Sequence, residues 1–241
     1  MTKTSTKPSQ GPLARVTGCL FLLSFFLPML NWILVNSRFV VAADAAEAAR
    51  RVAANEGLFR LGIVNDLLTA VIALGLALTL YRMLRSVNRS LALLALLLKA
   101  TEGGLLAAIA LGNFVALLIW KGHAAAPAVE LGQMQALVGL VFNTRMSVAA
   151  VPMVFLGLNL TVFLSLLYKS KYVPAFWAGF GVFSYLLILV YALLTMSFPD
   201  WAAILVIQSV CWAPSCLFEI AIGIWLLSRG IRDPGIVSVA S

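Results

Sequence analysis

The chain has 241 residues, of which 62% are hydrophobic and 11% are charged, and its mean hydropathy is +1.02. Soluble domains are about half apolar and about a quarter charged, so this composition excludes a water-soluble globular protein. The net charge of +8 does not indicate nucleic-acid binding, because most basic residues lie in the tails and in two short loops. These residues are Lys3, Lys7, Arg15, Arg82, Arg85, Arg89, Lys169, Lys171, Arg229 and Arg232.

The two ends of the chain are polar and the middle is apolar. Residues 1–12 contain Ser, Thr, Lys and Pro and predict a disordered cytoplasmic tail. The first apolar run is too long for the core of a signal peptide, so we expect it to be a retained span. Residues 13–230 then form a single transmembrane helical domain, and residues 231–241 form a second short cytoplasmic tail.

Apolar runs with charged borders predict an all-α fold, a polytopic transmembrane helix bundle of about six spans. The predicted spans cover residues 14–36, 58–81, 91–120, 143–168, 176–196 and 202–228. The loops 82–90 and 169–175 carry Arg or Lys without acidic residues. Because positive loops stay in the cytoplasm, we expect both termini to be cytoplasmic.

One or two interfacial helices are expected on the outer side. In the segment 37–57, Asp44 can cap a helix that Asn55 and Gly57 end. Residues 128–142 are predicted to form a second helix of this kind, which leads into the fourth span.

Three ionisable residues are predicted to lie near the middle of the membrane. Glu102 follows Arg89 by 13 residues and Glu219 precedes Arg229 by 10, which places both about 15–20 Å from the cytoplasmic boundary. Lys99 lies one helical turn before Glu102 on the same face. Two carboxylates near one ammonium leave one negative charge uncompensated, which indicates a protonatable site. The alternative is a neutralised network that only stabilises the fold.

Further polar residues recur at helical spacing and predict a polar cavity between the helices. Gln208 and Ser215 share a face with Glu219, Asn113 continues the face of Glu102 outward, and Asn159 follows Arg145 along the fourth span. Interhelical hydrogen bonding is the structural alternative for any one of them. Asp66 lies in the outer half of the second span, and we expect it to pair with Arg145 at the outer mouth of the cavity.

Metal and cofactor sites are not expected. His123 is the only histidine, and the three cysteines lie inside apolar segments. This excludes a zinc site with several histidine ligands and bis-histidine haem ligation within one chain.

Several segments in order along the chain resemble the bacterial membrane-protein family called domain of unknown function family 4386. The resemblance rests on GLFRLGIVNDLL (57–68), RSVNRSLALLALLLKATEGG (85–104), FLGLNLTVFLSLLYKSKYVPAFWAGFGVFSYL (155–186) and FEIAIGIWLLSRG (218–230). It implies a multi-pass protein of the bacterial inner membrane. It also implies a basic residue three positions before an acid in the third span, as in Lys99 and Glu102, and an acid before the last tryptophan, as in Glu219. It implies no activity.

Three functions remain open at this point. The first is binding or transport of a small ion or an amphiphilic ligand, with Glu102 and Glu219 in the site. Because no internal repeat is visible, a homo-oligomer could supply the second half of a transporter. The second is an enzyme that acts on a lipid- or terpenoid-like substrate, in which Glu102 and Glu219 are the catalytic acid–base pair. The third is an accessory subunit. The bilayer is the expected partner in all three, and nucleic acid in none.

Overall fold

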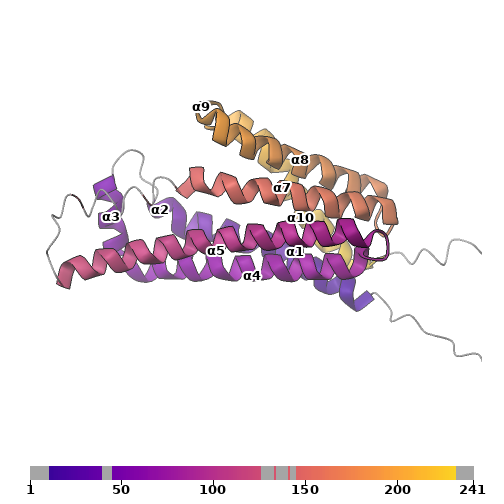
Figure 1. Ribbon diagram of the computed structural model, residues 1–241, viewed down its shortest axis with the longest axis horizontal. Helices are drawn as coiled ribbons and strands as arrows, with labels where there is room; N and C mark the ends of the chain where they lie inside the picture. Colours follow the sequence, from indigo (N-terminus) through magenta and orange to yellow (C-terminus); the bar gives the residue numbers. More distant parts are fainter. Residues whose placement is uncertain (1–10, 40–44, 126–132, 134–140, 142–144, 232–241) are drawn as a thin grey trace, which may run out of the picture.

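The computed structural model describes residues 11–39, 45–125, 133, 141 and 145–231 of the chain (Figure 1). Every regular element in these ranges is a helix. Six of the helices are long and apolar enough to cross a membrane. The prediction of an all-α polytopic bundle with six spans is therefore confirmed.

The first span begins with α1 (Gly11–Asn31) and continues without a break through a π-helical turn, η1 (Trp32–Asn36), and α2 (Ser37–Phe39). The other five spans are α4 (Glu56–Leu84), α5 (Arg89–Ala125), α7 (Arg145–Ser170), α8 (Ala175–Ser197) and α10 (Leu205–Arg229). Two short helices, α3 (Ala45–Ala54) and α9 (Pro199–Ala202), lie between spans.

The segment before the second span differs from the prediction in one respect. A helix is present as α3, but Gly57 does not end it, because α4 already begins at Glu56. Glu56 lies in the first turn of α4 and pairs with Arg60 one turn later, at 2.7 Å, and this arrangement favours a helix start there. The predicted cap Asp44 and the predicted helix over 128–142 lie outside the described residues, except for residues 133 and 141 of the latter.

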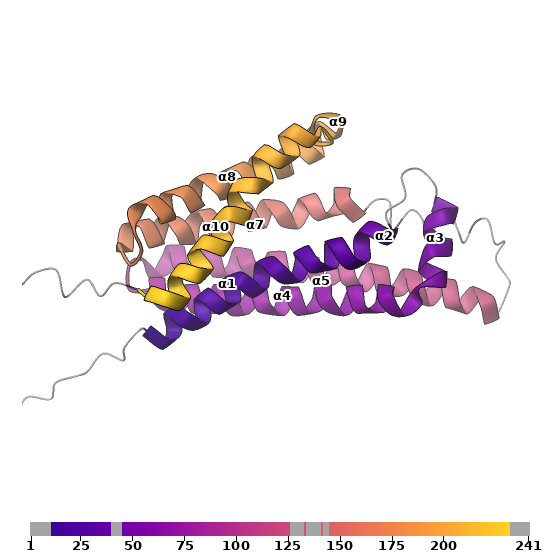
Figure 2. The same ribbon diagram turned by 180° about the vertical axis from the view of Figure 1, so that it is seen from behind.

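The six spans form a closed ring in which each helix packs against two neighbours. Going round the ring, α1 packs against α4, then α5, α7, α8 and α10 follow, and α10 returns to α1 (Figures 1 and 2). The α4–α5 and α7–α8 turns lie at the same end as the start of α1 and the end of α10, at the right in Figure 1. We call this the basic end, because Arg15, Arg82, Arg85, Arg89, Lys169, Lys171 and Arg229 gather there.

Glycines allow two of these helix pairs to approach closely. A Cβ atom at Gly18 of α1 would lie 2.7 Å from the carbonyl oxygen of Gly223 in α10. A Cβ atom at Gly157 of α7 would lie 2.7 Å from Cβ of Leu189 in α8. Small residues at such contacts let two helix backbones approach closely. Inside a membrane, where no hydrophobic force drives helices together, this close packing stabilises the helix pair.

Among the described residues, the apolar core is continuous in the half of the bundle near the basic end. There, one cluster joins all six spans and includes Phe21, Leu80, Phe163, Tyr185 and Phe218. Towards the opposite end, which we call the far end, the core separates into two clusters. One joins the first span, α3, α4 and α5 around Phe59, and the other joins α8, α9 and α10 around Tyr191.

Candidate functional site

A buried ion pair lies within α5. Nζ of Lys99 donates a hydrogen bond to Oε1 of Glu102 at 2.8 Å, and each side chain is 5% exposed. The two residues are three positions apart, so one helical turn brings the ammonium and the carboxylate together. A single helix therefore supplies both charges of the pair.

The second oxygen of Glu102 is held by the neighbouring helix. Nδ2 of Asn159, on α7, donates to Oε2 of Glu102 at 2.7 Å, and it also donates to the carbonyl oxygen of Phe155 one turn earlier. Asn159 is completely buried. Both carboxylate oxygens of Glu102 thus have donors, as a buried charge requires.

Glu219 occupies a different setting from Glu102. The hydroxyl of Tyr185, on α8, donates to Oε1 of Glu219, on α10. The ring of Tyr185 is held in place by an edge-to-face contact with Phe218, with 6.1 Å between ring centroids. Glu219 is only partly buried, and the charges of Lys99 and Glu102 both act on it electrostatically. Four helices therefore converge on one group of polar side chains.

This group lies at one depth in the bundle. Asn159 precedes Lys169 by 10 residues, and Tyr185 follows the start of α8 by the same number. At the rise of an α-helix, both lie about 15 Å from the basic end, close to the depth of Glu102 and Glu219. We call Lys99, Glu102, Asn159, Tyr185 and Glu219 the mid-membrane network.

Tyr185 is the member of the network that the sequence analysis missed. The neighbouring polar residue Ser184 is not part of the network, because its hydroxyl donates to the carbonyl oxygen of Phe180 in its own helix. The position of Tyr185 along its predicted span could have identified it, because tyrosines of membrane proteins are enriched at span ends. A tyrosine at the middle of a span needs a buried partner for its hydroxyl.

Serine hydroxyl groups in the spans bond their own helix. Ser215 donates to the carbonyl oxygen of Trp212 at 2.8 Å, and Ser24 donates to that of Phe21 at 2.9 Å. Asparagines make the contacts between helices instead: Asn65 of α4 donates to the carbonyl oxygen of Leu27 in α1. Gln208 lies half-buried one turn into α10, away from the mid-membrane network.

Asp66 receives a hydrogen bond from α1. Nδ2 of Asn31 donates to Oδ1 of Asp66 at 2.7 Å and to the carbonyl oxygen of Gly62 at 3.2 Å. Arg145 is the first residue of α7, but its side chain is outside the part of the chain that the structure describes. The predicted pair of Asp66 with Arg145 therefore stays a prediction.

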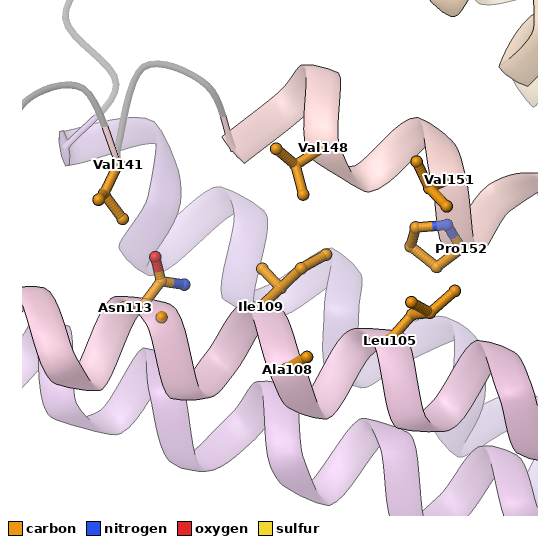
Figure 3. A pocket seen from close by; sticks show the side chains of 9 residues that line it. Leu105, Ala108, Ile109, Asn113, Val141, Val148, Val151 and Pro152 are labelled. Carbon is orange, nitrogen blue, oxygen red and sulfur yellow. The ribbon is translucent and has the colours of Figure 1, made fainter.

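Asn113 lies apart from the network, at a cavity between the far halves of α5 and α7 (Figure 3). Among the residues that the structure describes, the cavity wall is apolar apart from this one and contains neither Glu102 nor Glu219. Across the described ranges, no group of three or more His, Cys, Asp or Glu residues gathers in a way that could hold a metal ion.

Six apolar helices closed into a ring around buried charges define a multi-pass integral membrane protein. A model of the family described as domain of unknown function (DUF4386) matches residues 16–230. The chain belongs to this family. Comparisons with curated proteins and with solved structures give no match.

Proposed function

We propose that the mid-membrane network is a protonatable site at which the protein binds, and moves across part of the membrane, a proton or another small cation. The observation that supports this most directly is the number of charges. Two carboxylates, Glu102 and Glu219, accompany one ammonium, Lys99. When all three are ionised, the network has one excess negative charge in a low-dielectric region, and such a charge requires a proton or a cation.

Glu219 is the proposed group that binds the proton or cation, because both carboxylate oxygens of Glu102 already accept hydrogen bonds. Lys99 and Asn159 bond both oxygens of Glu102. Glu219 accepts from Tyr185 and is only partly buried, so it is the more accessible carboxylate. Pro214, five residues earlier in α10, removes one backbone N–H from the helix and leaves a carbonyl oxygen available. A phenol donor beside Glu219 stabilises its ionised form between binding events.

The orientation proposed for the chain follows from the basic end. Its basic residues, together with Lys3, Lys7 and Arg232 in the tails, favour a cytoplasmic location for both termini in a bacterial inner membrane. Cysteine introduced as Val87→Cys in the loop 82–90 should react with an impermeant maleimide only after cells are permeabilised. Ala203→Cys, at the exposed far end, should react in intact cells, and the reverse pattern would overturn the orientation.

Infrared difference spectroscopy tests the proton site directly. The protein in nanodiscs should show a carboxylic-acid C=O band that disappears as the pH is raised. The band should be absent from Glu219→Gln and present in Asp200→Asn, which serves as the matched control because Asp200 is an exposed carboxylate in α9, outside the network. A band that is the same in wild-type protein and in Glu219→Gln would exclude Glu219 as the proton-binding group.

Proteoliposomes test movement of the proton. With a pH indicator inside the vesicles, wild-type protein should accelerate the decay of an imposed pH gradient. In vesicles with Glu219→Gln, the gradient should decay as slowly as in empty vesicles. If the pH gradient decays at the same rate with wild-type protein and in empty vesicles, the protein binds the proton but does not move it across the membrane.

An enzyme acting on a lipophilic substrate remains an alternative hypothesis, as does an accessory subunit. An enzyme of this type needs a substrate cavity that reaches both carboxylates. Among the described residues, the wall of the cavity at Asn113 contains neither carboxylate, so this cavity does not supply the substrate site of such an enzyme.

A further inference from the structure

The cavity between α5 and α7 has the size and wall of a ligand site. Its volume is about 360 Å³, within the range of roughly 300–1,000 Å³ that small-molecule sites occupy. Leu105 and Ile109 of α5 face Val148, Val151 and Pro152 of α7 across it (Figure 3). Val148 and Val151 are exposed, so one side of this apolar site borders the bilayer.

Asn113 provides the one polar side chain among the described residues of the wall. Its side chain is 2% exposed, and its Nδ2 atom is buried with no hydrogen-bond partner in the described part of the chain. In Figure 3 the amide group extends from α5 towards the space below Val141. An unpaired buried donor is unfavourable, so a ligand with an acceptor oxygen at this position would complete the site.

The depth of Asn113 identifies where that oxygen would lie. Asn113 follows Arg89 by 24 residues, about 36 Å along α5, whereas the hydrocarbon core of a bilayer is about 30 Å thick. The guanidinium of Arg60 stands 5.9 Å from the ring centroid of the adjacent Phe114, so a charged group already occupies this level. Asn113 therefore lies at the outer edge of the hydrocarbon, where the ester groups of phospholipids are found.

The rest of the cavity extends inward from that level. Leu105, at its inner end, is eight residues before Asn113, about 12 Å deeper along the helix. Leu105 is also one helical turn beyond Glu102. A chain that enters at Asn113 thus passes along an apolar wall and ends next to the mid-membrane network.

We propose that this cavity binds one acyl chain of an ester lipid from the outer leaflet, with Nδ2 of Asn113 donating a hydrogen bond to the ester carbonyl oxygen. The apolar wall takes the chain, the depth matches the ester group, and the buried amide supplies the donor. This site is separate from the proposed proton site, and its failure would leave that proposal unchanged.

The test uses the full-length protein in nanodiscs that contain a phosphatidylcholine with a photoactivatable group in its acyl chain. Cross-linked peptides should come from 105–113 and 148–152. In Asn113→Leu, which keeps the size of the side chain but removes the donor, labelling of these peptides should fall by roughly 3- to 10-fold, as for the loss of one hydrogen bond. Unlabelled ester lipid should compete better than its ether analogue, which has no carbonyl group.

A second variant keeps the test decisive if Asn113→Leu folds poorly. Ala108→Leu fills the cavity and leaves Asn113 in place, and it should also reduce labelling. Ala100→Leu is the matched control, because Ala100 is exposed on α5 and does not line the cavity. Equal labelling of wild-type, Asn113→Leu and Ala108→Leu proteins, or equal competition by ester and ether lipids, would overturn the proposal. Stronger competition by a free fatty acid than by the ester lipid would overturn the choice of ligand.

Discussion

The ion pair within α5 should make Glu102 much more important for stability than Glu219, although both lie at similar depth. Glu102→Gln removes the carboxylate that lies 2.8 Å from Nζ of Lys99, in a side chain that is 5% exposed. Removing one partner of a buried ion pair destabilises a protein by about 3–5 kcal/mol. Because the charge of Glu219 also acts on this region, we expect a loss near the lower limit of that range.

Glu219→Gln should behave differently. The Gln side chain keeps an oxygen that can accept from Tyr185, and Lys99 and Glu102 remain as a neutral pair. The change replaces a charged acceptor by a neutral one, so we expect a loss of about 1 kcal/mol. If removing the excess charge is favourable, the loss is smaller still.

Reversible unfolding in mixed detergent micelles, with increasing sodium dodecyl sulfate, gives the free energies of unfolding by linear extrapolation. Asp200→Asn is the control, because Asp200 is exposed in α9. The reasoning is refuted if Glu219→Gln destabilises the protein as much as Glu102→Gln does. It is also refuted if Glu102→Gln costs less than about 1 kcal/mol, since the pair would then not behave as a buried one.

Two further changes test the packing and the Tyr185 contact. Gly18→Val should lower the free energy of unfolding by about 1–3 kcal/mol through overpacking against α10. Gly104→Val should not show this overpacking cost, because a Cβ atom at Gly104 meets nothing within 4 Å. Equal effects of the two changes would contradict the close approach of α1 and α10. Tyr185→Phe should cost about 1–3 kcal/mol because it removes a donor to a carboxylate, and it should shift the infrared band of Glu219. Tyr191→Phe, which loses only a 3.4 Å contact to the carbonyl oxygen of Ala202, should cost less and leave the band in place.

The spans could be predicted from the sequence because charged residues mark where each apolar run leaves the membrane. The predicted span 176–196 and the observed α8, Ala175–Ser197, differ by one residue at each end. One of the differences comes from a break in the backbone between two helices. The last span was predicted from 202, but the extended backbone at Ile204 separates α9 from α10, and a run of apolar letters does not reveal such a break.

The site could be predicted only in part. The pair of Lys99 with Glu102 follows from spacing on one helix, so sequence reasoning can reach it. Contacts between helices depend on the order of the ring and on helix rotation, which the sequence pattern does not define. For this reason Asn159 was assigned to a polar face without its partner Glu102, and the hydrogen bond from Asn31 to Asp66 was not predicted.

The way the charges are paired has a consequence for how the chain enters the membrane during synthesis. Lys99 and Glu102 lie in the same helix, so α5 can leave the translocon as a segment whose two charges already neutralise each other. Inserted separately, each would cost about 2.5–3.5 kcal/mol at the centre of a span. Glu219 is made last, and its donor Tyr185 belongs to the span made just before it. Each charge of the network therefore meets a first partner on its own helix or on a span made before it, and the second donor to Glu102, Asn159, follows in α7.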